Sequence, residues 1–402
     1  MPMNKIEKLI KELCPNGVEW KKLGEVCVHI CSGGTPNSKN SAYYNGEIPW
    51  LRTQEIDFRD IYETGMTITQ EGLDNSSAKW IPANCVIVAM YGATVGKIGI
   101  NKIPLTTNQA CCNLEINNQI ALYKYVFYCL TSQYEYIKSL GEGSQTNINA
   151  QIVKNLSIPL PPLPIQTEIV RILDKFVEQQ EQLERLIELR KKQYEYYREE
   201  MLKPKEGEVW ERKTLGEIAS KLASGATPTG GEDSYKSTGI SLIRSQNVLD
   251  FNMSFVGLAH IDESQAEKLK NVEVKENDLL LNITGDSVAR ICKVDSSILP
   301  ARVNQHIMII RLTNSVDCNY ILYSLIQAKN KLLQCAESNG GSRKALNKKN
   351  VSDFIVNIPS LSKQKEIAEF LDSFESSIAT LTSALEASKR RYEYYRDEVM
   401  RF

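Results

Sequence analysis

The sequence predicts an α/β (α+β) protein: two mixed α/β domains and two long helices that form an antiparallel coiled coil, arranged as a pseudo-twofold internal repeat. Two observations predict this architecture. A series of short motifs occurs twice in the same order, about half a chain length apart. Each copy then ends in a long segment whose apolar side chains recur at alternating steps of four and three residues. A repeat of this length is a duplicated domain pair rather than a solenoid repeat.

The repeated motifs are short, and they keep their order in both halves of the chain. The matching segments are Leu23-Gly24-Glu25 and Leu215-Gly216-Glu217, Ser32-Gly33-Gly34-Thr35-Pro36 and Ser224-Gly225-Ala226-Thr227-Pro228, Arg52-Thr53-Gln54 and Arg244-Ser245-Gln246, Asn108-Gln109 and Asn304-Gln305, and Tyr194-Glu195-Tyr196-Tyr197-Arg198 and Tyr392-Glu393-Tyr394-Tyr395-Arg396. The register shifts by only a few residues between motifs, which places insertions in loops.

Each copy begins with a globular part. Apolar runs such as Cys85 to Tyr91, punctuated by Gly, Pro and Asn, predict short strands. A helix is expected around Tyr123 to Leu140, with its counterpart at Tyr320 to Ala336. The proline-rich run from Pro159 to Pro164 is typical of a stiff extended connector that ends the first domain.

The second part of each copy is a long helix with one apolar stripe. The predicted seam consists of Ile169, Leu173, Phe176, Leu183, Ile187, Tyr194 and Tyr197 in the first helix, and Ile367, Leu371, Phe374, Ile378, Leu381, Leu385, Tyr392 and Tyr395 in the second. A sustained four-three pattern of this kind is typical of a coiled coil. Because a compact domain joins the two helices, we expect them to pair antiparallel. The predicted division of the chain is therefore 1–163 and 204–361 for the globular domains, and 164–203 and 362–402 for the helices.

Composition excludes several classes of protein. The 402 residues are 42% hydrophobic and 24% charged, and 48 basic side chains face 49 acidic ones for a net charge of −1. This excludes a protein that binds nucleic acid by bulk positive charge alone. The segment from Met1 to Leu13 is amphipathic rather than a secretory signal, and we expect its helix to pack near the carboxy-terminal helix. With no membrane-spanning stretch, the ten cysteines are expected as reduced thiols in a cytoplasmic protein.

Metal and catalytic sites are not expected. Cys27, His29 and Cys31 share one strand face, but without ligand spacing of the Cys-x-x-Cys kind a core strand is the better interpretation than a metal trio. The segment Gly92 to Lys97 is one residue too short for a phosphate-binding loop and is followed by Ile98 instead of Ser or Thr. The chain has 3 histidines and no Asn-Pro-Pro-Tyr methyltransferase motif, so no cofactor is expected in this chain.

Two similar domains joined by a rigid pair of helices suit two functions. One is the reading of two separated DNA sites, because the distance between reading heads fixes the distance between half-sites. The other is a coiled-coil scaffold whose two heads bind proteins and no DNA. The geometry alone favours neither.

In the order and duplication of these motifs, the chain resembles the DNA specificity subunit of type I restriction-modification systems. The resemblance covers the whole chain, from the Leu-Gly-Glu opening to the Tyr-Glu-Tyr-Tyr-Arg motif that closes each helix. It implies that each globular part is a target recognition domain for one half of a bipartite double-stranded DNA sequence. It also implies that the paired helices set the gap and dock two modification subunits, with restriction subunits completing the assembly. S-adenosylmethionine, ATP and Mg are then expected on those partners, and this chain is expected to be non-catalytic.

The comparison of the two copies sorts the candidate DNA-binding residues. Side chains that are identical in both heads cannot discriminate two different half-sites, so they suit folding or phosphate contacts. This shared set is Thr35, Arg52, Gln54, Asn108, Gln109, Ser144, Thr227, Arg244, Gln246, Asn304, Gln305 and Ser342. Positions that differ are candidates for base-edge contacts. They are Lys97, Gln145 and Thr146 in the first copy, and Arg290, Arg343 and Lys344 in the second.

Overall fold

The computed structural model describes residues 2–141, 147–337 and 344–402, and for residues 2–4 the backbone only. The chain divides into two compact units, Met1–Glu184 with Ser383–Phe402, and Arg185–Thr382. Each unit contains one globular part and portions of both long helices, so each can be described by itself. Within the described residues no helix has both the length and the apolar content needed to cross a bilayer.

The first unit is built on three small sheets. Its strands are β1 (Trp20–Lys22), β2 (Cys27–Ser32), β3 (Tyr44–Leu51), β4 (Asp60–Ile61), β5 (Thr67–Ile68), β6 (Trp80–Ile81), β7 (Val86–Ala89), β8 (Ile98–Asn101), β9 (Leu105–Thr107), β10 (Cys111–Ile116) and β11 (Ser157–Pro159). The strand orders are β2-β10-β7-β8-β4, β5-β3-β9-β6 and β1-β11. Its shorter helices are α1 (Pro2–Leu13), α2 (Leu23–Val26), α3 (Gln70–Asp74), α4 (Tyr123–Ser132), α5 (Tyr134–Ser139) and α6 (Ala150–Asn155).

The second unit repeats this topology. Its strands are β12 (Glu211–Thr214), β13 (Ala219–Ser224), β14 (Ile240–Ile243), β15 (Ala259–Ile261), β16 (Glu273–Val274), β17 (Leu279–Asn282), β18 (Ile291–Lys293), β19 (Ala301–Val303), β20 (Ile307–Leu312) and β21 (Ile355–Ile358). They form sheets of order β13-β20-β17-β18, β15-β14-β19-β16 and β12-β21. Its shorter helices are α8 (Leu215–Ile218), α9 (Glu263–Lys268), α10 (Cys318–Gln327), α11 (Lys329–Glu337) and α12 (Lys348–Ser352).

The two units therefore have matching sheets, and the match extends to details. In both, one strand pair of a four-stranded sheet is parallel (β3 with β9, β14 with β19), while its neighbours are antiparallel. The pairing of β2 with β10 is irregular at one point, and so is the equivalent pairing of β13 with β20. The predicted internal repeat and mixed α/β class are confirmed, since the duplication is present in the fold and not only in the motifs.

The predicted helix after the strands is broken into two. The segment from Tyr123 to Leu140 forms α4 and α5, which join at Gln133, and its counterpart forms α10 and α11. The inner surfaces of α4 and α10 are fully buried around Tyr125 and Tyr320, whose hydroxyls donate hydrogen bonds to the carbonyls of Pro159 (2.8 Å) and Asn357 (2.7 Å). These tyrosines connect the helix pair to the strand that precedes each long helix. Both predicted segments are therefore helical, and each is divided into two helices.

Each long helix has 39 residues, α7 over Leu163–Met201 and α13 over Leu361–Val399. In the first unit, Phe176 stacks on Tyr395 with ring centroids 5.4 Å apart, and Glu184 pairs with Lys389 at 3.2 Å. Glu184 comes after Phe176 in α7, whereas its partner Lys389 comes before Tyr395 in α13, so the two helices pair antiparallel. The same direction holds in the second unit, where the ring of Tyr194 contacts Phe374 and the ring of Tyr197, later in α7, contacts Phe370, earlier in α13.

The predicted seam residues lie on this shared side of the helices to different depths. Fully buried are Ile169, Leu173, Ile367 and Leu371, and nearly so are Ile187, Tyr194, Phe374 and Leu385. The half-buried members are Phe176, Leu183, Ile378, Leu381, Tyr392 and Tyr395. Tyr197 is 38% exposed. Burial is therefore deepest where each helix also packs on its own globular part.

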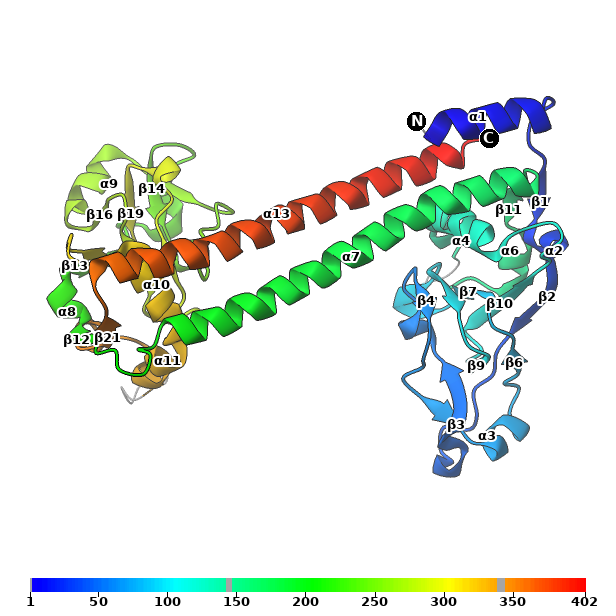
Figure 1. Ribbon diagram of the computed structural model, residues 1–402, viewed down its shortest axis with the longest axis horizontal. Helices are drawn as coiled ribbons and strands as arrows, with labels where there is room; N and C mark the ends of the chain where they lie inside the picture. Colours follow the sequence, from blue (N-terminus) through cyan, green and yellow to red (C-terminus); the bar gives the residue numbers. More distant parts are fainter. Residues whose placement is uncertain (1, 142–146, 338–343) are drawn as a thin grey trace. The chain divides into compact units, whose positions relative to one another are not determined.

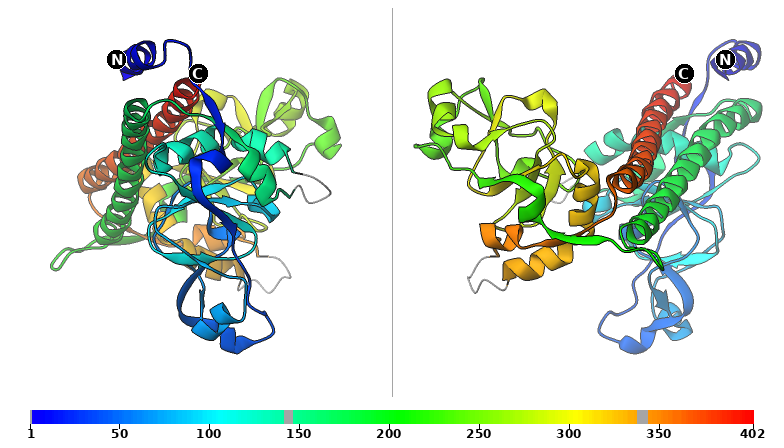
Figure 2. Two further views of the ribbon diagram at one scale, coloured as in Figure 1. Left: turned by 90° about the vertical axis from the view of Figure 1, so that its right-hand side faces the viewer. Right: turned by 60° about the vertical axis from the view of Figure 1, so that its left-hand side comes forward.

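Helix α1 belongs to the first unit and lies beside the end of α13 (Figures 1 and 2). Ile6 is buried in one hydrophobic cluster with Val399 and Met400. Lys5 Nζ pairs with Glu168 of α7 at 2.9 Å. The amino-terminal helix thus caps the pair of long helices within this unit.

Candidate nucleic-acid interface

In each unit a shared threonine and a shared glutamine meet. They join the loop that follows β2 or β13 to the turn that leads into β10 or β20. In the first unit the Thr35 hydroxyl donates a hydrogen bond to the side-chain carbonyl of Gln109. The N–H of Gly34 donates to Thr107 O at 2.9 Å. A Cβ on Gly33 would lie 2.0 Å from that same oxygen, so only glycine permits this approach.

The second unit builds the same junction from the equivalent residues. The Thr227 hydroxyl donates to the side-chain carbonyl of Gln305, and a Cβ on Gly225 would lie 1.7 Å from Val303 O. The shared Thr and Gln side chains therefore satisfy each other. Within each unit this contact holds two loops together.

The shared asparagines join this junction to the smaller sheet. The N–H of Asn108 donates to Leu51 O at 3.0 Å, and that of Asn304 donates to Ile243 O at 3.1 Å. The Asn304 side chain also accepts a hydrogen bond from the His306 N–H at 3.1 Å. Each asparagine thus fixes the end of the strand that precedes the shared arginine.

The two shared arginines are held differently. Arg52 approaches only Glu55, with Nε 3.6 Å from the carboxylate, and this buried Nε has no hydrogen-bond partner among the described residues. Arg244 donates to Glu232 and to Gly257 O (2.8 Å), and its guanidinium lies 5.4 Å from the Tyr235 ring centre. The Arg244 guanidinium is therefore held by neighbouring residues of its own unit.

The shared glutamines beside these arginines lie at the surface. Both Gln54 and Gln246 are exposed. The Gln246 amide donates a hydrogen bond of 3.4 Å to Gly257 O. At these two positions the units therefore present side-chain amides to the solvent.

Two of the candidates that differ between the copies, Lys97 and Arg290, lie on the tight turns that lead into β8 and β18. Strand pairing aligns Ile98 with Val88 and Ile291 with Leu281, so the preceding residues Lys97 and Arg290 occupy equivalent places. Lys97 Nζ pairs with Asp57 at 2.6 Å. The Arg290 guanidinium has no hydrogen bond or ion pair to any residue that the structure describes.

Most of the other candidates cannot be placed relative to this turn. Ser144, Gln145, Thr146, Ser342 and Arg343 lie outside the described residues. The residues that follow them dock on the turn. Gly92 N donates to the Asn147 side chain at 3.3 Å, and Gly285 N donates to Lys344 O at 3.2 Å. The Lys344 ammonium pairs with Glu337 at 2.7 Å.

The second unit contains a polar contact at His306 that the comparison of the two copies does not predict. The Gln305 amide donates to His306 Nε2 at 3.0 Å, so the other ring nitrogen carries the proton and donates to the Thr284 hydroxyl at 2.6 Å. The chain of bonds runs from Thr227 to the turn that carries Arg290. No shared motif could reveal it, because the first unit has Ala110 and Tyr91 at these places.

Burial changes the acidity of several cysteine thiols in the first unit. Burial raises the pKa of the Cys27 thiol to about 12, so this thiol is protonated at neutral pH. Burial also raises the pKa of Cys85 and of Cys112 to about 12. No set of three His, Cys, Asp or Glu side chains within the described ranges is arranged to hold a metal ion.

The sequence of this chain is similar to those of several known proteins. The family model of the type I restriction modification DNA specificity domain matches twice, over residues 15–191 and 207–388. The specificity subunit of the Escherichia coli type I restriction enzyme EcoR124I/EcoR124II is 30% identical over 70% of this chain and 71% of its own. The MjaIX specificity subunit of Methanocaldococcus jannaschii is 25% identical over 78% of this chain and 76% of its own.

A solved structure shares the fold over nearly the whole chain. The S subunit of the type I restriction-modification system of M. genitalium aligns with a TM-score of 0.62 and 16% identity, covering 96% of this chain and 97% of that one. The two domain matches of the family model and this fold agree with the duplication seen in the sheets.

Proposed function

Because the chain belongs to the family of type I restriction modification DNA specificity domains, we propose that it is the non-catalytic subunit that reads the DNA target of such a complex. Each globular part, 1–163 and 204–361, reads one half of a bipartite sequence. The observation that supports this most is the repeated scaffold with different turn residues. Equivalent loops are fixed by the same Thr–Gln contact, while the adjacent turn carries Lys97 in one unit and Arg290 in the other. Equivalent scaffolds with different half-buried cations at the turn suit two different half-sites.

The long helices, 164–203 and 362–402, are proposed to set the gap between the half-sites and to dock two modification subunits. The second tyrosine of each Tyr-Glu-Tyr-Tyr-Arg motif is exposed to the same extent, 62% at Tyr196 and 62% at Tyr394. Each lies edge-on to the following tyrosine, at 5.3 Å and 5.5 Å between ring centres. Exposed aromatic side chains at equivalent places suit two copies of one partner.

The partners supply the chemistry and much of the DNA affinity. S-adenosylmethionine belongs to the modification subunits, and ATP and Mg to the restriction subunits. Since the net charge of this chain is −1, we expect weak DNA binding alone and tight binding in the complex.

The test is a gel-shift assay of the chain with its modification partner, after mapping N6-methyladenine in host DNA with and without this gene. We expect methylation at one bipartite sequence that disappears with the gene, and a shift of DNA that carries this sequence. A protein-binding scaffold would leave methylation unchanged and give no sequence-dependent shift.

Arg290→Ala tests the assignment of the turn. Because the guanidinium is unengaged by the described residues, its loss is expected to weaken binding of the cognate target by about 1–3 kcal/mol, the range for a base-edge contact. Binding to random DNA should change little. The matched control is Lys268→Ala, an exposed lysine of α9 in the same unit. An equal loss on both DNAs would assign Arg290 to a phosphate instead.

The spacer role is tested by one heptad inserted in α7 between Leu183 and Arg190, with a matching heptad in α13 between Ile378 and Leu385. Seven residues add about 10 Å of helix, or roughly three base pairs. The mapped target should gain a gap of that length while both half-sites stay the same. An unchanged gap would remove the spacer role without affecting the role in recognition.

A further inference from the structure

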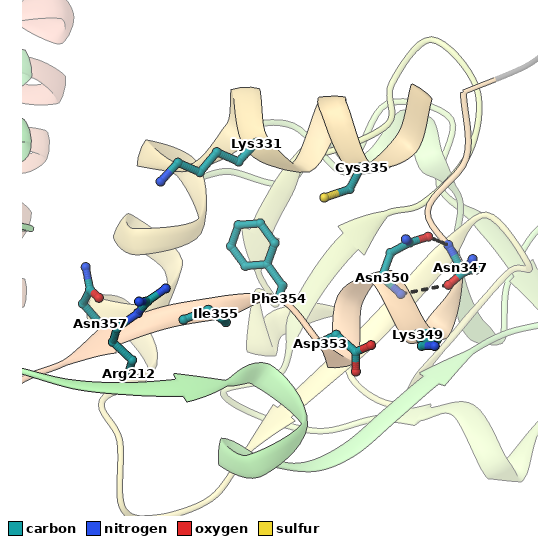
Figure 3. Close-up of a pocket in the computed structure, with 10 residues that line it drawn as sticks. All are labelled: Arg212, Lys331, Cys335, Asn347, Lys349, Asn350, Asp353, Phe354, Ile355 and Asn357. Carbon is teal, nitrogen blue, oxygen red and sulfur yellow. Dashed lines mark hydrogen bonds between the residues drawn. The ribbon is translucent and has the colours of Figure 1, made fainter. Parts of the chain in front are cut away.

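A polar groove lies in the second unit away from the turn that carries Arg290. Its volume is about 930 Å³. Figure 3 shows its walls: Lys331 and Cys335 come from α11, Arg212 and Asn357 from β12 and β21, Lys349 from α12, and Asp353 directly follows α12. Asn347 and Asn350 line the end at which α12 begins.

Three cations from three different elements line this groove. Arg212, Lys331 and Lys349 are all exposed. None of their charged groups forms an ion pair or a hydrogen bond with the residues that the structure describes. Asp353 is the one acidic side chain in the lining, so the groove carries a net positive charge. Unpaired cations that converge on a concave surface attract an anion.

The first unit has the same groove with a different lining. There it measures about 750 Å³ and lies between β1, β11, α5 and α6. Trp20 stands where the second unit has Arg212, Tyr136 stands for Lys331, and Gln151 stands for Lys349. Trp20 and Tyr136 are 51% and 58% exposed. Both units therefore contain the groove, but its lining is cationic only in the second unit.

One end of the cationic groove lies close along the chain to the segment that bonds to the proposed reading turn. Residues 344–346 form this segment: Gly285 N donates to Lys344 O at 3.2 Å, and Leu346 N donates to Ile283 O at 2.7 Å. Helix α12 begins two residues later, at Lys348, with the Asn347 side chain accepting a hydrogen bond from the Asn350 N–H at 2.8 Å. DNA held at the turn therefore passes close to the end of the groove.

We propose that this groove binds the phosphate backbone of duplex DNA beside the half-site read by the second unit. The inference rests on the proposed DNA-reading function and adds to it a contact that carries no sequence information. Lysine, arginine and side-chain amides are the groups that contact DNA phosphates. A protein partner would instead require an apolar centre with exposed aromatic rings. Exposed aromatic rings are present in the groove of the first unit, at Trp20 and Tyr136, whereas the aromatic ring in the lining of this one, Phe354, is buried and Ile355 is its exposed apolar side chain.

The experiment measures DNA binding by the complex of this chain with its modification subunits at several salt concentrations. The probes are a duplex that carries the mapped target with long flanks and a random duplex of equal length. The variant is the triple substitution R212A/K331A/K349A. The control, K236A/K268A/K270A, removes the same charge from exposed lysines of the same unit outside the groove. A conservative variant, K331R/K349R, keeps the charges of the groove.

Each phosphate contact contributes about 0.9 to the slope of log affinity against log salt. The triple variant is therefore expected to lower the slope by about 2 to 3. Between 50 and 200 mM salt this amounts to a difference of roughly 40-fold in the loss of affinity. The change should be the same on both probes, and the methylated sequence should not change. The control and the conservative variant should keep the original slope.

Three outcomes would overturn the groove assignment while leaving the reading function intact. These are an unchanged slope, an equal fall in the control, and a loss of modification-subunit binding with DNA affinity preserved, which would make the groove a protein site. Failure of the unsubstituted complex to prefer the mapped target would instead refute the proposed function itself. Hydrogen exchange of the second unit shows that the variant is folded.

Discussion

Gln166→Leu is expected to loosen the attachment of the first long helix to its globular part. The Gln166 side chain is fully buried at the start of α7. Its amide donates to Ile120 O at 3.0 Å and to Pro161 O at 2.8 Å, and its carbonyl accepts from Leu122 N at 2.9 Å. One side chain thus satisfies three backbone groups from two segments.

The size of the effect follows from those three bonds. Leucine has a similar volume and cannot replace any of them, so three backbone groups lose their partner. Each such group costs about 1–3 kcal/mol when it stays buried, and the lower end applies to groups that regain water. We expect the free energy of unfolding of the first unit to fall by about 3 kcal/mol.

The second unit supplies an internal comparison. Gln364 occupies the same place in α13 and makes two such bonds, donating to Pro359 O at 2.8 Å and accepting from Asp317 N at 2.9 Å. Gln364→Leu should therefore cost about 2 kcal/mol, and the loss should fall on the second unit. Gln179→Leu, on the exposed side of α7, is the matched control and should change stability by less than about 0.5 kcal/mol.

The assay is hydrogen exchange followed by mass spectrometry in increasing urea, because it reports the opening free energy of each unit separately. Peptides from α4 and α10 report the two units. If Gln166→Leu and Gln179→Leu lowered stability equally, the hydrogen bonds would not be the cause. A loss spread evenly over both units would contradict the local anchoring.

Two further predictions concern the amino-terminal helix and the loop junction. Hydrogen bonding to Arg171, and then to Lys5, lowers the pKa of Glu168 from its usual 4.5 to about 2. The contribution of this carboxylate to the stability of the folded state is therefore complete above pH 4.5 and is lost as the pH falls towards 2. Exchange protection of α1 should fall over that window, and Lys5→Met should lower it already at pH 7; equal protection in both proteins would contradict the ion pair. Gly225→Ala should destabilise the second unit by more than about 1 kcal/mol, because the new Cβ would lie 1.7 Å from Val303 O. Urea-dependent exchange measures this, and normal stability would mean that the loop can move aside.

Some features were determined by sequence alone because they depend on patterns along the chain. The four-three spacing of apolar residues defined the long helices within a few residues, since a helix places every third and fourth side chain on one face. The duplicated motifs predicted two matching domains. The order of those motifs also led to the family, because motif order is a property of the sequence.

Other features were decided only by the tertiary structure because they depend on contacts between distant segments. Thr35 and Gln109 were expected as members of one set, but only the fold shows that they bond to each other. Arg52 and Arg244 are identical in sequence, yet Glu232 engages only the second of them. A single sequence does not reveal such differences, because a partner many residues away leaves no local pattern.

The cationic groove illustrates the same division. In sequence, Arg212, Lys331 and Lys349 are three ordinary charges in a chain whose net charge is −1. Folding brings β12, α11 and α12 around one hollow and concentrates those charges in it. The sequence by itself determined the helices, the duplication and the family, because these depend on spacing along the chain. Only the tertiary structure decided which side chains are engaged and where charge gathers, because electrostatic and hydrogen-bonding energies depend on distance in space.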